Sequence, residues 1–295
     1  MRSRRYTSRT AAEARAWQAD LRAELWQILR LDDLAGGRAI PLEVRVESAE
    51  PRAGYQLQQL TFASTPGRRI PALLALPDGA AGPVPAVVCI HGHGGNRHSV
   101  HDPASIYWGF AAALSERGYA TVAVDVGQHQ VYEEGRLLMG ERLWDCVRCV
   151  DLLASLPQVD AARIGCAGLS LGGEMAMWLG AMDERIAAEV SSGFLTTMDQ
   201  MEHNHCMCWK FDGLRDLVDY ADLYALTAPR ALQCQNGLQE GPTMFHVLLA
   251  RQVLAEVEPA WRVLGRPDAV GLQVHAGGHV IDLPALLGFF ATHLA

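Results

Sequence analysis

Ser170 lies in the sequence Gly-Leu-Ser-Leu-Gly-Gly of residues 168–173. A serine hydroxyl becomes a useful nucleophile only when a nearby base removes its proton. The apolar residues 163–167 predict a strand before this turn, and residues 174–179 predict a helix after it. A serine held in a strained turn between strand and helix needs glycine two positions before and two positions after it. The pattern favours a nucleophilic serine over the alternative, a glycine-rich turn without chemistry.

The general base for Ser170 is expected to be a histidine that comes late in the chain. Where a serine stands on such a turn, the acid and then the histidine follow it in sequence. His246 and His293 fall in predicted helices, and His275 falls in a predicted strand. His279 follows two glycines just past that strand, where a turn can bring the imidazole to the serine. We predict His279 as the base; the alternatives are His275 and a plain surface position for His279.

The acid that orients this base should follow the preceding predicted strand, 231–235. Glu240 is the first carboxylate after that strand, and the next is Glu256. A carboxylate there fixes the tautomer of the histidine and stabilises its positive charge. We predict Glu240 as the acid; its alternative is a solvated charge in the first turn of a helix that begins near Pro242. Asp222 is a competing acid, although its position before an apolar run is typical of a helix cap.

Two backbone N–H groups are expected to stabilise the oxyanion of a tetrahedral intermediate. One is the N–H of Leu171, the residue after the nucleophile. The other should come from the loop 91–95, His-Gly-His-Gly-Gly, which follows a predicted strand and has small residues that expose backbone amides. We assign the second donor to the N–H of His93, with that of Gly94 as the alternative.

Histidine and cysteine side chains also raise the question of a metal. His91 and His93 flank one glycine without a third ligand beside them, and residues 203–208 read His-Asn-His-Cys-Met-Cys, with Cys234 as a further candidate. The first pair lacks a third ligand, and the spacing in residues 203–208 matches no usual zinc pattern. We expect no metal and no cofactor, and we expect residues 203–208 to form a lid or pocket wall together with Trp209.

Strands and helices alternate along most of the chain. This order predicts an α/β fold, a mostly parallel twisted sheet with helices on both faces and the serine turn after a central strand. The polar insertions 128–140 and 194–224 should overhang the carboxyl ends of the strands, where ligands bind in such sheets. Substrate contacts are expected from His91, Gly94, His129, Phe194, His205 and Trp209. The predicted strands are 55–64, 69–77, 86–90, 120–126, 163–167, 186–192, 231–235 and 270–276, and the predicted helices are 10–31, 106–117, 143–156, 174–179, 243–257 and 282–293.

The composition describes an acidic chain with ample apolar content. Its 295 residues carry a formal net charge of −8, and 49% of them are hydrophobic. An acidic chain is not expected to bind nucleic acid or an anionic membrane. No apolar run suits a bilayer or a secretion signal, so we expect a cytoplasmic protein that binds a small-molecule substrate. The amphipathic helix 10–31 can pack on its own domain or on a second copy in a homo-oligomer.

The seven cysteines are expected to be mostly reduced core residues. Cys146 and Cys149 have the spacing of a redox pair, but they fall on one face of a predicted helix, which favours a packing role.

Several segments carry a resemblance to a known family. They are the strand and loop 87–95, Leu-Pro-Gln-Val-Asp at 156–160 before Arg-Ile-Gly at 163–165, the serine turn, and Leu-Thr-Ala-Pro-Arg-Ala-Leu at 226–232. Together they resemble the α/β-hydrolases, and within them the dienelactone-hydrolase-like and acetyl xylan esterase-like branch. The resemblance implies the α/β-hydrolase fold and a serine esterase with the triad Ser170, His279 and Glu240. It covers the chain from about residue 55, which suggests an N-terminal helical extension, 1–54, packed on a catalytic domain, 55–295.

Two departures from the family pattern narrow the expected activity. Dienelactone hydrolases use a cysteine nucleophile where this chain has Ser170, and the family's usual acid is an aspartate where this chain has Glu240. We therefore expect a carboxylesterase or acetylesterase that works through an acyl-enzyme and a Ser-His-Glu triad. The alternatives are an amidase or peptidase with the same machinery, and a non-catalytic ligand-binding protein with the same fold.

Overall fold

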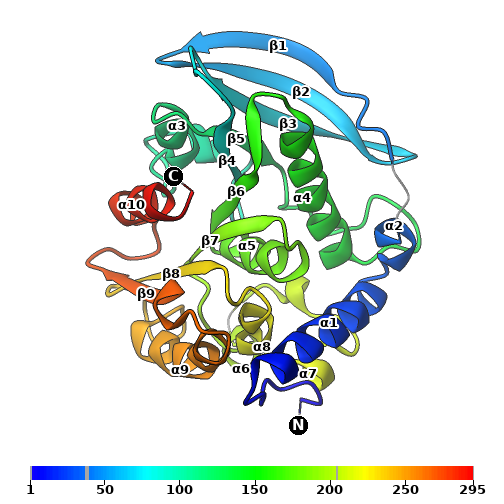
Figure 1. Ribbon diagram of the computed structural model, residues 1–295, viewed down its shortest axis with the longest axis vertical. Coiled ribbons are helices and arrows are strands. Elements are labelled where there is room, and N and C mark those ends of the chain that lie inside the picture. The colour runs from blue at the N-terminus through cyan, green and yellow to red at the C-terminus, as the bar shows by residue number, and fades with distance from the viewer. Residues whose placement is uncertain (1, 37–39, 204, 295) are drawn as a thin grey trace.

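A computed structural model describes residues 2–36, 40–203 and 205–294. Within these ranges one nine-stranded sheet runs through the molecule in the order β1-β2-β3-β5-β4-β6-β7-β8-β9 (Figure 1). Strands β4 to β9 are parallel to one another, and β3 joins them through an antiparallel pairing with β5. The strands are β1 (Arg45–Arg52), β2 (Tyr55–Thr65), β3 (Arg68–Pro77), β4 (Val84–Ile90), β5 (Ala120–Val124), β6 (Val159–Leu169), β7 (Ile186–Ser192), β8 (Ala231–Gly237) and β9 (Val270–His275).

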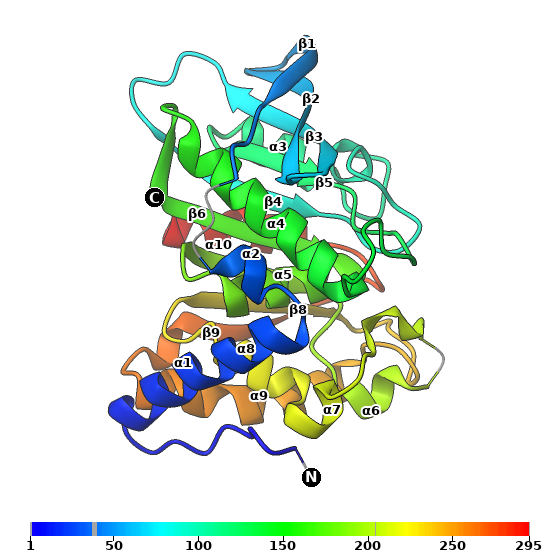
Figure 2. The ribbon, with the colours of Figure 1, turned by 90° about the vertical axis from the view of Figure 1, so that its right-hand side faces the viewer.

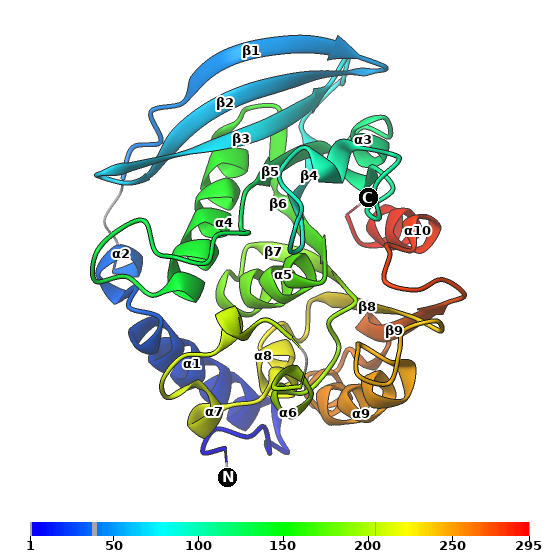
Figure 3. The same cartoon turned by 180° about the vertical axis from the view of Figure 1, so that it is seen from behind.

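Helices cover both faces of this sheet, as the alternation of elements predicts. Side chains of β4 show why both faces need cover: Val88 and Ile90 belong to one buried cluster, whereas Val87 and Cys89 belong to the other. Helices α3 and α10 lie on one side, and α4 and α5 lie on the opposite side (Figures 1 and 3). The helices are α1 (Ala11–Ile28), α2 (Asp32–Ala35), α3 (Phe110–Ser115), α4 (Leu138–Ser155), α5 (Leu171–Met182), α6 (Met198–Met201), α7 (Leu214–Leu217), α8 (Tyr220–Ala225), α9 (Val247–Val263) and α10 (Leu283–His293).

The main disagreement with the sequence analysis is strand β1. Residues 45–52 pair antiparallel with β2 as the edge of the sheet, but all eight residues are exposed. An exposed edge strand has no apolar alternation to reveal it, so the sequence analysis placed these residues in the N-terminal helical extension. The predicted boundary after residue 54 therefore separates β1 from the sheet to which it belongs.

Helices α4 and α5 begin earlier than the sequence predicts, at Leu138 and Leu171, whereas α3 and α9 begin later. Helix α3 begins four residues late because Trp108 and Gly109 have φ angles of 52° and 58°, which no α-helix accepts. Helix α9 begins at Val247, with the His246 side chain accepting a hydrogen bond from Leu249 N–H at its cap. The predicted hairpin of β2 and β3 and the strand β7 are confirmed.

The amphipathic N-terminal helix α1 packs on its own chain. Leu21 and Leu25 are fully buried, and the Gln18 amide donates hydrogen bonds to the carbonyls of Ala225 and Ala228. Figure 2 shows α1 lying beside α8 at the lower end of the molecule. No helix among the described residues is long and apolar enough to span a membrane.

Candidate active site

Ser170 is the single residue between the end of β6 and the start of α5. Its backbone has φ 63° and ψ −124°, a conformation that costs energy for a residue with a side chain. The N–H of Ser170 donates to the carbonyl of Ser192 at 2.9 Å, and its carbonyl accepts from the N–H of Glu174 at 2.9 Å. The turn that the sequence predicts is present, and it projects the serine at the carboxyl end of a central parallel strand.

The glycines around Ser170 are required by close backbone approaches. A Cβ atom on Gly168 would lie 2.2 Å from the carbonyl oxygen of Gly172, and one on Gly172 would lie 2.2 Å from the carbonyl oxygen of Ile90. A Cβ on Gly173 would lie 2.5 Å from the carbonyl oxygen of Ser192. No side chain can be added at these positions without moving the backbone. The serine turn is thus wedged between β4 and β7.

His279 and Glu240 are joined as the sequence analysis predicts. The His279 Nδ1 and the Glu240 Oε1 lie 2.9 Å apart, and only 2% of the Glu240 side chain is exposed. A carboxylate on Nδ1 holds the proton on that nitrogen and leaves Nε2 free to act as a base. The ring of His279 also stacks on Phe245, with centroids 5.3 Å apart and planes 16° apart.

Backbone contacts hold the loops that carry these two residues. The N–H of Leu238 donates to the carbonyl of His275, and the N–H of Gln239 donates to the carbonyl of Gly277. A Cβ on Gly237 would lie 2.3 Å from the carbonyl oxygen of Gly278, so the loop after β8 lies directly on the loop after β9. His275, the alternative base, accepts the N–H of Gly277 on its own Nδ1 and stays within this turn.

Gly193 lies between His279 and the serine turn and brings the two close together. A Cβ on Gly193 would be 2.7 Å from Cε1 of His279 and 3.1 Å from Cδ1 of Leu169. Gly193 follows Ser192, whose carbonyl holds the Ser170 N–H. Within the described part of the chain no hydrogen bond links Ser170 Oγ to His279. Such contacts are commonly loose before substrate binds and tighten in the complex.

The loop 91–95 after β4 lies against the serine turn. A Cβ on Gly92 would be 3.0 Å from Cβ of Ser170, and the Gly92 N–H donates to the hydroxyl of Tyr107 at 2.7 Å. The N–H of Leu171 begins α5, where the first N–H groups of a helix have no partner inside it. The assignment of Leu171 and His93 as oxyanion donors remains a prediction, and this loop placement is compatible with it.

The residues predicted to contact substrate fall in several environments. His91 is buried, donates from Nδ1 to the carbonyl of Gly92 and accepts the N–H of Val126 on Nε2. Both ring nitrogens are therefore occupied, and His91 holds the loop rather than facing a ligand. Gly94 has a φ of 73° and open space where a side chain would be.

An aromatic layer lies beneath His279. Phe194 is buried and packs on Phe245, which contacts both His279 and His205. The Nε2 of His205 lies 3.1 Å from the carbonyl oxygen of Thr243, whereas Trp209 is 1% exposed and so lies in the core rather than in a pocket wall. Asn204, within the predicted lid segment, lies outside the described residues.

The sequence analysis missed Tyr107 and Phe245. Both are aromatic residues in irregular segments, and aromatic residues there have no periodicity that marks them. Their roles follow only from tertiary contacts with Gly92 and His279. The competing acid Asp222 accepts hydrogen bonds from the N–H groups of Asp219 and Tyr6, as expected for a capping residue.

Comparisons with known proteins give the family. The model of the acetyl xylan esterase family matches residues 31–201. Bacillus subtilis YtaP, a hydrolase by name, is 28% identical over 239 residues, which are 72% of this chain and 78% of that protein.

Solved structures share the fold at low identity. A Bacteroides fragilis structure, named as an acetyl xylan esterase, superposes with a TM-score of 0.77 at 21% identity and covers 93% of this chain and 78% of that one. The glucuronoyl esterase of Solibacter usitatus superposes with a TM-score of 0.70 at 19% identity, covering 92% and 94%. The fold is that of the α/β-hydrolases, and the chain belongs to the acetyl xylan esterase family, whose members are carboxylic ester hydrolases.

Proposed function

We propose that this enzyme is a serine esterase with the triad Ser170, His279 and Glu240. The observation that carries the proposal is the 2.9 Å contact between His279 and the buried carboxylate of Glu240, next to the glycine-lined turn that bears Ser170. The three groups follow β6, β8 and β9 at one edge of the sheet, in the chain order that this fold uses.

The proposed reaction has two halves. His279 takes the proton of Ser170 while Oγ attacks the ester carbonyl, and Glu240 stabilises the imidazolium that forms. The N–H groups of Leu171 and His93 stabilise the oxyanion, and His279 then protonates the leaving alcohol. Water attacks the acyl-serine with His279 again acting as base, which releases the carboxylic acid and restores the serine.

We propose esters of a short acyl group, acetate first, as substrates. The support is the family name and the name of the Bacteroides fragilis structure, both of which describe esterases of acetyl groups. A series of p-nitrophenyl esters from acetate to octanoate measures this preference directly, and we expect kcat/KM to be highest for acetate. A maximum at octanoate would contradict the short-acyl assignment without affecting the triad.

The triad itself is tested by Ser170→Ala. We expect kcat for p-nitrophenyl acetate to fall by about 10⁴-fold or more, because removing a nucleophile eliminates the acyl-enzyme route. Thermal unfolding of the variant shows whether the fold is retained. A matched anilide series separates esterase from amidase activity, and faster cleavage of the anilide than of the ester would overturn the esterase proposal.

A further inference from the structure

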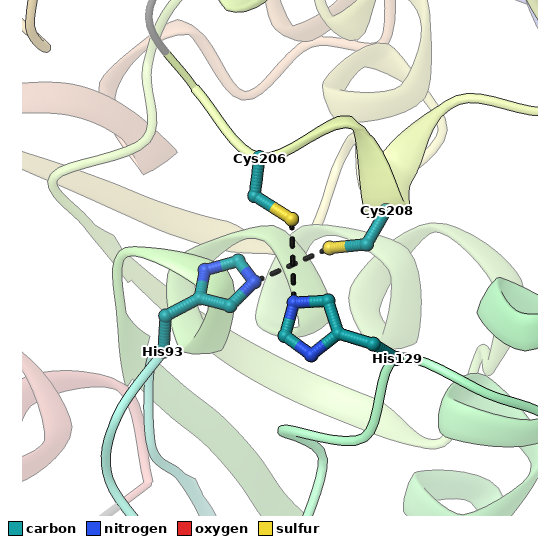
Figure 4. Close-up of side chains that lie close together, drawn as sticks. All are labelled: His93, His129, Cys206 and Cys208. Atoms are coloured by element: carbon teal, nitrogen blue, oxygen red, sulfur yellow. Dashed lines mark hydrogen bonds between the residues drawn. The ribbon is translucent and has the colours of Figure 1, made fainter.

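Four side chains that the triad does not use point toward one centre. They are His93, His129, Cys206 and Cys208 (Figure 4), and their nitrogen and sulfur atoms all lie within 4.8 Å of one another. Nε2 of His93 lies 3.2 Å from Sγ of Cys208, and Nε2 of His129 lies 3.3 Å from Sγ of Cys206. The two imidazole rings lie beside each other, with centroids 5.4 Å apart.

The four residues come from three loops at one edge of the sheet. His93 follows β4, His129 follows β5, and both cysteines belong to the insertion after β7. These strands are parallel, so their carboxyl ends meet at the edge that also carries Ser170. The loops are otherwise free to diverge, and residues with ordinary surface roles have no reason to converge on one point.

The donor set selects the ion. Two thiolates and two imidazoles in a tetrahedron suit Zn²⁺, whereas Mg²⁺ and Ca²⁺ prefer oxygen ligands. With Zn–S near 2.3 Å and Zn–N near 2.0 Å, tetrahedral ligand atoms are separated by about 3.3–3.8 Å. The two N–S separations of 3.2 and 3.3 Å are close to this range, and the remaining pairs, all within 4.8 Å, need to close by about 1 Å at most to enter it.

A buried cation lies against one of the four residues. Nη1 of Arg142 donates to Sγ of Cys208 at 3.3 Å, and Nη2 of the same side chain donates to the carbonyl of Gln128. Arg142 is fully buried on α4, so it holds the loop with His129 and the loop with Cys208 together. A donor on a ligating sulfur is the usual second partner of a metal site.

We propose that His93, His129, Cys206 and Cys208 bind one Zn²⁺ ion as a closed structural site. On binding, the two thiols release two protons to solvent, and the four ligands leave no open position for water or substrate. The ion ties the insertion after β7 to the loops after β4 and β5. It therefore fixes a segment beside the active site without taking part in ester hydrolysis.

The test measures metal content and geometry rather than activity. The full-length protein is purified under reducing conditions, incubated with ZnSO₄, dialysed and assayed for zinc. We expect one Zn²⁺ per chain, and we expect Co²⁺ in its place to give the intense sulfur-to-metal absorption and tetrahedral visible bands of a thiolate site. Zinc should also raise the unfolding temperature by several degrees.

Ligand variants decide between this site and adventitious binding. Cys206→Ser/Cys208→Ser and His129→Ala should each lose the stoichiometric zinc and the cobalt spectrum, whereas His203→Ala, in the same segment but outside the cluster, should retain both. Retention of zinc by the double cysteine variant would overturn the proposal. A wild-type protein that binds no zinc would also overturn the proposal, whether thiol titration finds Cys206 and Cys208 free or finds them joined in a disulfide.

Discussion

The serine turn and the insertion after β7 are held in opposite ways. Around Ser170, backbone lies on backbone at Gly168, Gly172 and Gly173, and α5 is buried along its whole length. The insertion is built from the short helices α6 and α7, and Gly213 there has open space around it. The first region is positioned by backbone packed on backbone, and the second by buried side chains such as Trp209 and Leu214 between irregular loops.

Carboxyl groups show the same contrast. Burial raises the pKa of Glu189, on β7 beneath the serine helix, to about 8, with Thr227 as its hydrogen-bond donor. Hydrogen bonds from Arg215 and Lys210 lower the pKa of the exposed Glu202 in the insertion to about 2. The packed region accepts the buried Glu189 at a cost, whereas Glu202 in the insertion keeps its charge in solvent.

The largest effect is expected where the packed region does chemistry. Glu240→Gln should lower kcat by roughly 10³–10⁴-fold, because the amide no longer favours the productive tautomer of His279 or stabilises its charge. Steady-state kinetics with p-nitrophenyl acetate measure this change. Glu202→Gln, in the insertion, should stay within about threefold of wild type. Equal losses in the two variants would remove the distinction between the regions.

A second pair of variants tests the packing itself. Gly172→Ala places a Cβ 2.2 Å from the carbonyl oxygen of Ile90, so we expect the free energy of unfolding to fall by roughly 3–4 kcal/mol and kcat by about 100-fold. Gly213→Ala puts alanine at a φ of 84° with nothing within 4 Å, and should cost about 1 kcal/mol with kcat unchanged. Urea unfolding and steady-state kinetics on both variants measure these effects. A Gly172→Ala variant with wild-type stability and kcat would contradict the account.

The buried carboxyl predicts a pH dependence of stability. Below about pH 4.5 Glu189 is protonated in both states; between there and pH 8 the unfolded chain releases the proton while the folded chain keeps it. Stability attributable to this group therefore falls as pH rises through that window. In Glu189→Gln, the decrease in the free energy of unfolding between pH 5 and 8 should be smaller than in wild type by on the order of 3 kcal/mol, as measured by urea unfolding.

Glu202→Gln is the matched control for this pH dependence. Its folded pKa is depressed, so its contribution is present above about pH 4.5 and is lost as pH falls toward 2. The difference between this variant and wild type should therefore stay constant from pH 5 to 8. A changing difference would show that the insertion, too, contains a titrating carboxyl in this range.

The smallest effect is expected at the loop that meets the serine turn. Tyr107→Phe removes the hydroxyl that accepts the Gly92 N–H, leaving a buried donor without a partner. We expect kcat to fall about tenfold with KM little changed, since the loop 91–95 would be less well positioned around the oxyanion. Tyr132→Phe, at an exposed position, should have no effect. An unchanged kcat in Tyr107→Phe would show that this hydrogen bond does not help the loop 91–95 to stabilise the oxyanion.

Sequence alone could predict what depends on local structure and chain order. The turn around Ser170 needs glycines at set positions, and the order of acid and histidine led to Glu240 and His279. The structure brings these two together. The exposed strand β1 and the contacts of Tyr107 could not be predicted, because neither leaves a periodic pattern.

The histidine and cysteine cluster shows the same limit more sharply. The sequence analysis considered His91 with His93, and residues 203–208, as separate metal candidates; it rejected the first for lack of a third ligand and the second on spacing. His93 and Cys208 are 115 positions apart in the chain, and His129 and Cys206 are 77 apart. Only the meeting of three strand ends makes them neighbours.

The central claim is that Ser170 is the nucleophile, and covalent labelling tests it most directly. The intact protein is treated with a fluorophosphonate and digested, and the labelled peptide is identified by mass spectrometry. We predict about one label per chain, on Ser170, and no label after Ser170→Ala or after denaturation. An active, folded preparation that takes up no label, or takes it up at another residue, would contradict the account.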